Sequence, residues 1–393
     1  MKISKCHKKN AFRTRVIQRI EEITREEWDS VFPDVLESYN FFKTLDESNL
    51  SQFKLFYILV YNGKRLVGAT HCFLVNYSLD TSISGPLRRI SNAIKKAAPN
   101  LFSLKAFVCG MPMGQGRIGV TPDSSGALEA ILRRMERIAR KERAPIIAFK
   151  DFDHSYAGIL DPLQRDGFVK MESLPTTQIN VWFSDFEEYL KTLSAASRYD
   201  LRRKFKKADK LAGIKMEIVS SLDEAALTDV YRMYLDIVEK HDMGFELLPK
   251  EFFRLLSKNM PKETKYFLWR IDGKLAAFLL CLVSDEMLID YYVGLDYKIA
   301  LEYHLYFLKF RDVMNWCIKN KIKCYEMGIT GYEPKRRLGF DFIPLYLYAK
   351  IRNKALRPIF KILCGILRFE NFDPALKKGK TARRKKAATL QNI

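Results

Sequence analysis

The chain has 393 residues, 48% of them hydrophobic and 29% charged, a composition that is typical of globular domains and excludes disordered or collagen-like chains. This length predicts two domains, because one domain usually contains roughly 100–200 residues. No run of about 18 uncharged apolar residues occurs, so we expect no ordinary membrane-spanning helix. We also expect no secretory signal, because the N-terminal residues contain no apolar core. Seven scattered cysteines without a Cys-x-x-Cys pair favour a reducing compartment, the cytoplasm, over a disulfide framework or a zinc ribbon.

The net charge of +21 is concentrated at the two ends of the chain. Residues 1–19 carry +7 and residues 350–393 carry +11, which leaves +3 for residues 20–349. We therefore expect basic tails over residues 1–19 and 371–393, the latter disordered, and an amphipathic basic helix over 351–370. Such a helix suits an anionic surface, in particular the inner face of a membrane. The alternatives are solvated tails, tails that bind nucleic acid, and a helix that packs on the second domain.

The first half of the chain contains a series of elements that the second half repeats. They are a hairpin at Tyr61-Asn62-Gly63-Lys64, a strand ending at Phe107–Gly110, a helix over 125–143, a strand over 145–149 and the segment Asp161–Phe168. Asn-Gly between apolar runs is typical of a tight two-residue turn. An insertion over about residues 78–103, with a short basic amphipathic stretch at 86–96, lengthens this half.

The second half contains the same elements in the same order. They are a hairpin at Ile271-Asp272-Gly273-Lys274, a strand over 287–294, a helix over about 300–320, a strand over 323–328 and the segment Glu333–Phe340. Segments 161–168 and 333–340 share the pattern acid-Pro-x-x-Arg-x-Gly-Phe at a separation of 172 residues. The glycine suits a left-handed helix end, and the phenylalanine then enters the core. The repeated order predicts an internal duplication.

This order of elements resembles the GNAT acyltransferase fold. The segment Phe186–Ala208, which contains Arg198-x-x-Leu201-Arg202-Arg203, resembles the opening of BioF2-like, FemAB-related acetyltransferase domains. The resemblance covers residues 180–350 more fully than residues 20–180. It implies an α/β fold of two tandem GNAT-like domains, over 20–180 and 181–350. Each domain would be a mixed, mostly antiparallel sheet with a splayed parallel strand pair, flanked by helices.

The resemblance also implies acyl-CoA as co-substrate, with its pyrophosphate held by backbone N–H groups after the first splayed strand. The residues that it places there are Tyr292, Gly294, Leu295, Asp296 and Lys298. This segment has one glycine and an acid, where the family usually has Gln/Arg-x-x-Gly-x-Gly/Ala. Because of this departure, an aminoacyl group from charged tRNA, the donor of some FemAB-related proteins, stays open as the alternative.

Acyl transfer to an amine requires a base, donors for the carbonyl oxyanion and an acid for the leaving group. Asp290 is the first choice of base, because a carboxylate inside an apolar strand is costly unless it is paired or functional. Strict alternation would put it on one face with Tyr292 and Gly294. Glu326, on the adjacent strand, is the second candidate, and repulsion between the two carboxylates would raise one pKa. The alternative for both is a carboxylate with a purely structural partner.

His304 is a third candidate base if it faces the splayed strands, and Tyr332 is a candidate acid. A buried helix histidine with a structural partner is the alternative for His304. Three basic residues are predicted to bind phosphates or a carboxylate of the acceptor: Lys335, Arg336 and Arg337. We expect no metal, because His154 and His241 have no second histidine at ligand spacing.

The sequence thus predicts an N-acyltransferase that moves an acyl group, acetyl or longer, from acyl-CoA to an amine acceptor. One alternative is Fem-like aminoacyl transfer from charged tRNA to a cell-envelope or peptide amine, with the basic helix 198–210 against the tRNA phosphates. The other alternative is a non-catalytic tandem module that binds membrane or nucleic acid through its basic tails.

Overall fold

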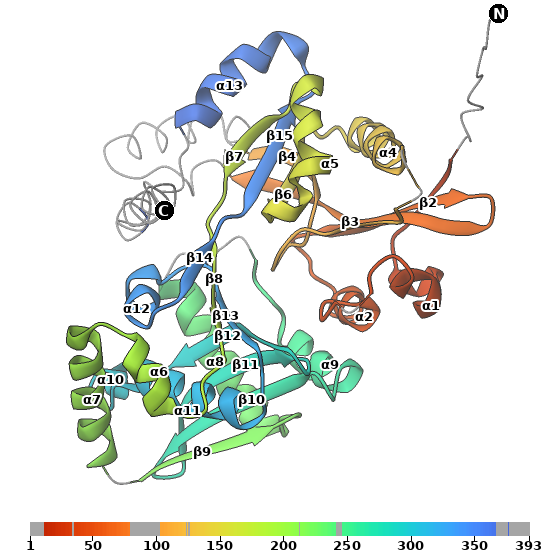
Figure 1. Cartoon of the computed structure of the whole chain (residues 1–393). Helices are drawn as coiled ribbons and strands as arrows, with labels where there is room; N and C mark the ends of the chain where they lie inside the picture. The colour runs from red at the N-terminus through yellow and green to blue at the C-terminus, as the bar shows by residue number, and fades with distance from the viewer. Residues whose placement is uncertain are drawn as a thin grey trace, which may run out of the picture. The chain divides into compact units, whose positions relative to one another are not determined.

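The computed structural model describes residues 12–33, 35–78, 103–122, 124, 126–211, 213–240, 246–366 and 376. These residues form two compact units (Figure 1). The first unit contains residues up to Asp46, Leu50–Met171 and Tyr346–Cys364. The second unit contains Glu172–Leu345, with Glu47–Asn49 and the chain from Gly365.

The first unit is an eight-stranded sheet with helices. Its strands are β1 (Arg13–Ile17), β2 (Lys54–Asn62), β3 (Arg65–Ser78), β4 (Ser103–Cys109), β5 (Ile118–Val120), β6 (Ile146–Phe152), β7 (Val169–Glu172) and β15 (Tyr346–Ile351). Its α-helices are α1 (Arg25–Asp29), α2 (Tyr39–Glu47), α4 (Ala127–Lys141), α5 (Ala157–Leu160) and α13 (Arg357–Ile366). Short 3-10 turns lie at Ile20–Glu22, His154–Tyr156, Asp161–Asp166 and Lys354–Leu356.

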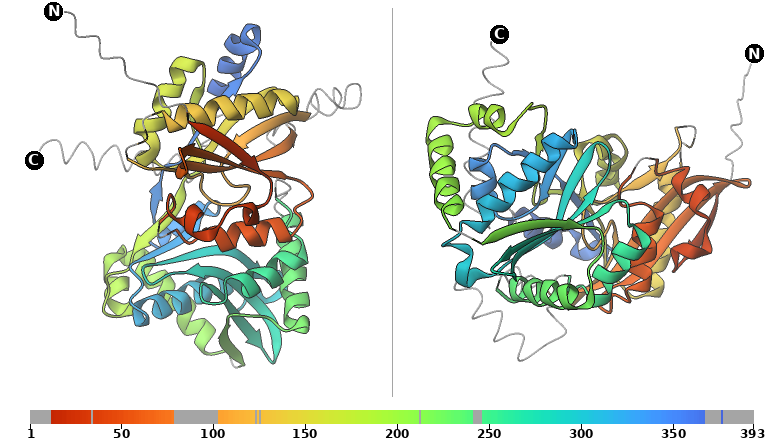
Figure 2. Two further views of the ribbon diagram at one scale, coloured as in Figure 1. Left: turned by 90° about the vertical axis from the view of Figure 1, so that its right-hand side faces the viewer. Right: turned by 90° about the horizontal axis from the view of Figure 1, so that it is seen from below.

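The second unit is a seven-stranded sheet with helices on both faces, which Figure 2 shows from two sides. Its strands are β8 (Thr176–Asn180), β9 (Ile214–Val219), β10 (Thr264–Ile271), β11 (Lys274–Val283), β12 (Met287–Leu295), β13 (Cys324–Gly328) and β14 (Asp341–Ile343). Its helices are α6 (Phe186–Thr192), α7 (Ala195–Asp209), α8 (Glu224–Lys240), α9 (Lys250–Asn259), α10 (Tyr297–Ala300), α11 (Leu305–Lys319) and α12 (Tyr332–Arg337).

The two sheets have the same strand order with one strand exchanged. The first runs β1-β2-β3-β4-β6-β15-β7, with β5 on β3, and the second runs β9-β10-β11-β12-β13-β8-β14. Each has one parallel pair, β4 with β6 and β12 with β13. The sixth strand of each sheet comes from the other half of the chain. The predicted class, α/β with a splayed parallel pair in each half, is confirmed.

This exchange moves the division between the units away from the expected boundaries. Residues 176–180 were expected in the first domain, but they pair as β8 with β13 and β14 of the second unit. Residues 346–350 were expected in the second domain, but they pair as β15 with β6 of the first. A boundary read along the chain cannot show such an exchange, because strand pairing is a non-local contact.

The local turn predictions are confirmed. Asn62 pairs with Arg65 and Ile271 pairs with Lys274, so each hairpin has a two-residue turn. Gly167 and Gly339 have φ of 87° and 78°, in the left-handed region that favours glycine. Phe168 and Phe340, which follow these glycines, are buried in the two cores.

Three predictions at the ends and in the second helix need correction. The tail over residues 1–19 is shorter than expected, because Arg13–Ile17 form β1 against β2. The helix expected over 300–320 is divided into α10 and α11, because His304 has a left-handed φ of 50°. The helix expected over 351–370 is α13, and its residues up to Cys364 belong to the first unit. The insertion at 79–102 and nearly all of 371–393 lie outside the described residues.

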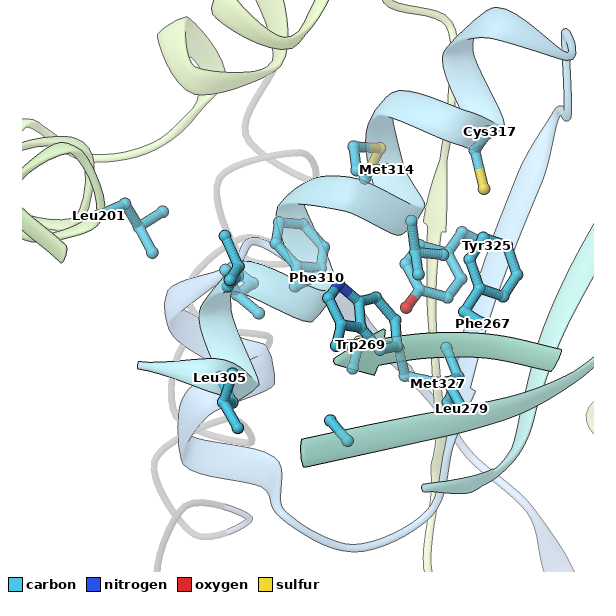
Figure 3. Packing of buried hydrophobic residues seen from close by; sticks show 14 of the residues in the cluster. Leu201, Phe267, Trp269, Leu279, Leu305, Phe310, Met314, Cys317, Tyr325 and Met327 are labelled. Carbon is cyan, nitrogen blue, oxygen red and sulfur yellow. The ribbon is translucent and has the colours of Figure 1, made fainter. Parts of the chain in front are cut away.

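The core of the second unit lies between α11 and the sheet (Figure 3). The buried face of α11 contributes Phe310, Met314 and Cys317, which recur at helical spacing. The strands contribute Trp269 and Tyr325. This packing holds α11 across the end of the parallel pair, where the polar residues of the candidate site lie.

Candidate active site

The parallel strands β12 and β13 separate after a short paired stretch. Their register contains three pairs, the last of which joins Ile289 and Glu326. Asp290 is the next residue on β12, so its side chain lies where the strands part. The backbone pairing between β12 and β13 ends before this residue. Beyond it, side chains of the neighbouring elements bond to Asp290.

A β-bulge at this point changes which residues share a face. On β11, Leu280 pairs with Tyr292 and Cys281 pairs with Asp290, so Tyr291 is an extra residue on β12. Asp290 therefore points toward α11, whereas Tyr292 packs against Tyr234 of α8 on the other face. The prediction that Asp290, Tyr292 and Gly294 share a face is wrong, because it assumed uninterrupted alternation.

Asp290 is the centre of a buried polar cluster. Lys309 of α11 donates from Nζ to Asp290 Oδ2 at 3.1 Å, and the Tyr325 hydroxyl donates to the same oxygen at 3.1 Å. The side chain of Lys309 is 1% exposed and that of Asp290 is 9% exposed. On Oδ1, the contact in this cluster is the weak thiol donor of Cys281 at 3.7 Å. Oδ2 is thus held by two strong donors, while Oδ1 has a weak one.

The hydroxyl and thiol groups around Asp290 are held in their neutral forms. Burial, together with the Asp290 charge, raises the pKa of the Tyr325 hydroxyl well above its usual range. The same two causes raise the pKa of the Cys281 thiol. Burial also raises the pKa of Tyr306, on the first turn of α11. Near neutral pH the hydroxyls of Tyr325 and Tyr306 and the thiol of Cys281 therefore stay protonated.

Lys335 is a second buried lysine beside this cluster. Its Nζ donates to the carbonyls of Met327, Gly328 and Ile329 at 2.6, 3.1 and 3.2 Å. Burial lowers the pKa of Lys335 to about 7, and the charge of Asp290 opposes that shift. Because its three N–H donors are used on the protein's own backbone, Lys335 shapes the loop after β13. We predicted that it binds the acceptor; the structure places it in the interior instead.

Glu326 lies next to Tyr325 on β13, and alternation puts its side chain on the other face of the sheet. It is buried, and Thr176 of β8 donates to its Oε1 at 2.7 Å. A hydroxyl on the exchanged strand is thus one of its hydrogen-bond partners. The two carboxylates do not share a face, so the expected common cleft is not formed.

His304 lies near α7, away from Asp290. It precedes α11, and burial with the charges of Lys207 and Lys204 lowers its pKa. Tyr332 is also removed from the split. Its hydroxyl donates to the carbonyl of Pro175 at 2.9 Å, and its ring packs on Phe342. The geometry gives Tyr332 a structural partner, while the role of His304 as a base stays a prediction.

Arg336 and Arg337 lie at the end of α12, where both bond to Glu333. The hydrogen bond from Arg336 lowers the pKa of Glu333 to about 2. The two arginines line a cavity of about 510 Å³ with the start of α7 and Phe307. They are the members of the predicted acceptor-binding set that reach a cavity.

The segment expected to bind the pyrophosphate of acyl-CoA does not fit that group. Asp296 caps α10, and its Oδ1 accepts a hydrogen bond from the backbone N–H of Lys298 at 2.9 Å. A protein carboxylate thus occupies the position that a phosphate would need. A Cβ on Gly294 would lie 2.2 Å from the Phe278 ring, so this glycine makes room for core packing. Leu295 is buried, and Tyr292 donates to Glu246 at 3.2 Å.

Among the described residues, no group of three or more His, Cys, Asp or Glu side chains could hold a metal ion. His154 lies in the first unit with Tyr346 as its ring neighbour. His241 lies outside the described ranges.

Sequence reasoning missed Lys309 and Tyr325, which complete the cluster. Lys309 interrupts the otherwise apolar stretch Leu305–Phe310, and a lone lysine within a buried helix face signals a paired charge. Tyr325 precedes the candidate Glu326, and alternation alone puts one of the two residues toward α11. Their meeting at Asp290 is a tertiary contact.

The chain belongs to the FemAB-like family, described as peptidoglycan biosynthesis/recognition, whose model matches residues 19–364. Among solved structures it is similar to FemX, with 12% identity, a TM-score of 0.55 and coverage of 88% of this chain and 100% of that one. It is also similar to a tandem GNAT protein from the clavulanic acid biosynthesis pathway, with 12% identity, a TM-score of 0.50 and coverage of 86% and 98%.

No curated protein matches the chain in sequence. The likeness to the two structures confirms the tandem GNAT-like fold, and the family match confirms the FemAB relation that Phe186–Ala208 suggested. Family and fold together support a transferase of the acyl or aminoacyl class that acts on cell-wall precursors.

Proposed function

We propose that this protein transfers an aminoacyl group from charged tRNA to an amine of a peptidoglycan precursor, at the split between β12 and β13. The family's description supports the acceptor class. The observation that carries the choice of site is the buried Asp290–Lys309 ion pair directly after the last β12–β13 pair. A buried charge pair is costly to desolvate, so its presence where the two strands part calls for a functional reason. A charged-tRNA donor would place the reaction in the cytoplasm.

In this reaction Asp290 accepts a proton from the acceptor ammonium. The neutral amine attacks the ester carbonyl of the aminoacyl group, and the second amine proton passes to the ribose oxygen as the C–O bond breaks. Oδ1 is the atom suited to the first transfer, because Lys309 and Tyr325 already occupy Oδ2. Lys309 and Tyr325 are positioning residues in this scheme, since they fix the orientation of the carboxylate.

The surface of α7 supports the tRNA donor. Lys206 and Lys207 are exposed, and neither forms an ion pair within the described part of the chain. Tyr199, on the same helix, is 73% exposed. Exposed cations next to an exposed aromatic ring suit phosphate contacts and base stacking. Nearby, Arg202 and Arg311 line a cavity of about 480 Å³ between α6, α7 and α11.

The turn between β12 and α10 argues against acyl-CoA as donor, because the Asp296 carboxylate already caps α10. An anionic pyrophosphate would meet a like charge there. Acyl-CoA, which the GNAT-like fold allows, is therefore the competing donor that the experiment must test.

The test is a transfer assay with the full chain, a peptidoglycan precursor peptide and either tRNA charged with a labelled amino acid or labelled acetyl-CoA. We expect label on the peptide from charged tRNA and none from acetyl-CoA. The double variant Lys206→Glu/Lys207→Glu should raise the KM for charged tRNA about 10-fold, because phosphate contacts are lost. Lys262→Glu/Lys319→Glu, which reverses two other exposed charges, is the matched control and should keep the parental KM.

Transfer from acetyl-CoA without transfer from charged tRNA would overturn the proposed donor and leave the site intact. An unchanged KM in the Lys206→Glu/Lys207→Glu variant would remove α7 from the donor site. Labelling at the parental rate when Asp290 is replaced by Asn would overturn the proposed site itself.

A further inference from the structure

Among the residues that the structure describes, the helix α13 presents an apolar face that no other element covers. Ile359, Ile362 and Leu363 are 58%, 64% and 52% exposed, and their i, i+3, i+4 spacing puts them on one side of the helix. Cys364 lies on the opposite side and is buried. Leu356, one turn earlier, is 44% exposed. Large apolar side chains that are exposed singly are ordinary, but a contiguous stripe marks an interaction surface.

The surroundings of this stripe are cationic. Lys354 and Lys361 are exposed, and neither has an ion-pair partner among the described residues. In the sequence, no acidic residue occurs between Asp341 and Glu370, and residues 377–386 add seven lysines and arginines. An apolar face with cationic flanks is the pattern of a helix that lies in the interface of an anionic bilayer.

We infer that α13 docks this protein on the surface of an anionic membrane, with Ile359, Ile362 and Leu363 inserted among the lipids. No helix of the described residues is long and apolar enough to cross a bilayer, and α13 itself has ten residues. It lies in the interface, with its buried side on the first unit. The inserted residues belong to the first unit and the proposed active site to the second, and each proposal has its own readout, so the two can fail independently.

Charge favours a lipid surface over two other occupants of the apolar face, namely a second copy of this chain and a basic segment of the chain outside the described ranges. A second copy would bring Lys354 and Lys361 against the same cations, in a chain of net charge +21. Two chain segments outside the described ranges, 79–102 and 377–393, are themselves basic. A second copy or either of these segments would bring like charges together, whereas anionic lipid headgroups complement them.

The test is sedimentation of the full chain with vesicles of phosphatidylcholine alone or in an equimolar mixture with phosphatidylglycerol. We expect binding to the mixed vesicles and weak binding to phosphatidylcholine. Ile362→Glu should lower the partition coefficient at least about 10-fold, because it removes apolar burial and adds a like charge to the lipid. Leu301→Glu is the matched control: Leu301 is 83% exposed in the second unit, and this change should leave binding at the parental level.

A second readout separates insertion from simple charge attraction. In an Ile362→Trp variant the added indole should shift its emission to the blue on mixed vesicles and be quenched by brominated lipid chains. Parental binding of Ile362→Glu, or an unshifted indole in vesicle-bound Ile362→Trp, would overturn the inference and assign binding to the basic tails alone. A dimer in sedimentation velocity that Ile362→Glu dissociates would overturn it in favour of a second copy.

Discussion

In the first unit the parallel strands β4 and β6 pair as far as Cys109 with Phe149, and in the second β12 and β13 pair as far as Ile289 with Glu326. The residue that follows on the first strand is Gly110 in one unit and Asp290 in the other. Where the parallel strands separate, the first unit thus has a glycine without a side chain, and the second unit has a carboxylate that is paired with a buried lysine.

The space at the two splits is filled in different ways. In the first unit, the backbone N–H of Gly116 donates to the carbonyl of Asp151 on β6 at 3.0 Å. A Cβ on Gly116 would lie 2.3 Å from the Lys150 carbonyl oxygen, so the loop backbone lies directly against β6. In the second unit, the space beside β12 holds the side chains of Lys309 and Tyr325.

This difference shows how a duplicated fold can divide its tasks. Both units keep the strand order and the Gly-Phe helix end, which serve packing. In the proposed scheme the second unit supplies the general base, Asp290, with Lys309 and Tyr325 as its positioning residues. We therefore expect changes at the second split to affect turnover, and changes in the first unit to affect stability.

The largest effect should come from removing the exchanged strand. A chain that ends after Leu345 lacks β15, which separates β6 from β7 in the first unit, while all seven strands of the second unit remain. We expect the amides of β6 to lose hydrogen-exchange protection and those of β11 to keep it. A chain that ends after Leu376 retains β15 and is the control. Protected β6 amides in the shorter chain would show that the first sheet does not depend on the exchange.

Asp290→Asn should lower turnover by about 10²–10⁴-fold, the usual contribution of a general base. Activity should recover partly at high pH, where the acceptor amine is already neutral. The matched change in the first unit is Asp151→Asn, since Asp151 has φ of 58° and asparagine tolerates that conformation. It should retain turnover within a few-fold. Equal losses in the two variants would contradict a division of tasks between the units.

Acid should destabilise the first unit through His71. Neither ring nitrogen of this buried histidine of β3 has a hydrogen-bond partner in the described part of the chain. Burial, with the charges of Arg117 and Lys150, lowers its pKa to about 3. The unfolded chain, with a histidine pKa of about 6.5, binds the proton first, so stability present above that pH is lost as the pH falls toward 3. Between pH 7 and 5 the loss is about 2 kcal/mol.

The measurement is urea unfolding of the parent and of His71→Phe at several pH values. The difference in pH dependence between the two proteins isolates the contribution of His71 from that of other titrating groups. Parallel curves would show that His71 is protonated equally in the folded and unfolded chain.

The smallest effect should come from the glycines that the two units share. Gly167→Val and Gly339→Val should each destabilise by roughly 1–3 kcal/mol, because a β-branched residue is strained at positive φ. Gly167→Asn and Gly339→Asn, which tolerate this conformation better, should lose less. Thermal unfolding measures both series. A valine variant that melts with its asparagine counterpart would contradict a strict need for a left-handed residue.

Features that depend on neighbours in the chain could be predicted from the sequence. The Asn62-Gly63 and Asp272-Gly273 turns and the Gly-Phe helix ends follow from local conformational preferences, and the duplication follows from their repetition in the same order. The Asp296 cap is also a local signal: aspartate before a helix commonly binds the first free N–H groups. An aspartate cap predicted at Asp296 is therefore, by itself, an argument against a pyrophosphate at this turn.

Features that depend on contacts between distant residues were decided by the tertiary structure. The exchange of β8 and β15 follows from pairing across more than a hundred residues, and no local pattern specifies it. The bulge at Tyr291 reverses the face of every later residue on β12, because side chains alternate with period two. Asp290 could be singled out because a carboxylate in an apolar strand needs a reason. Its partners Lys309 and Tyr325 come from a helix and a neighbouring strand, and only packing of α11 on the sheet brings the three groups together.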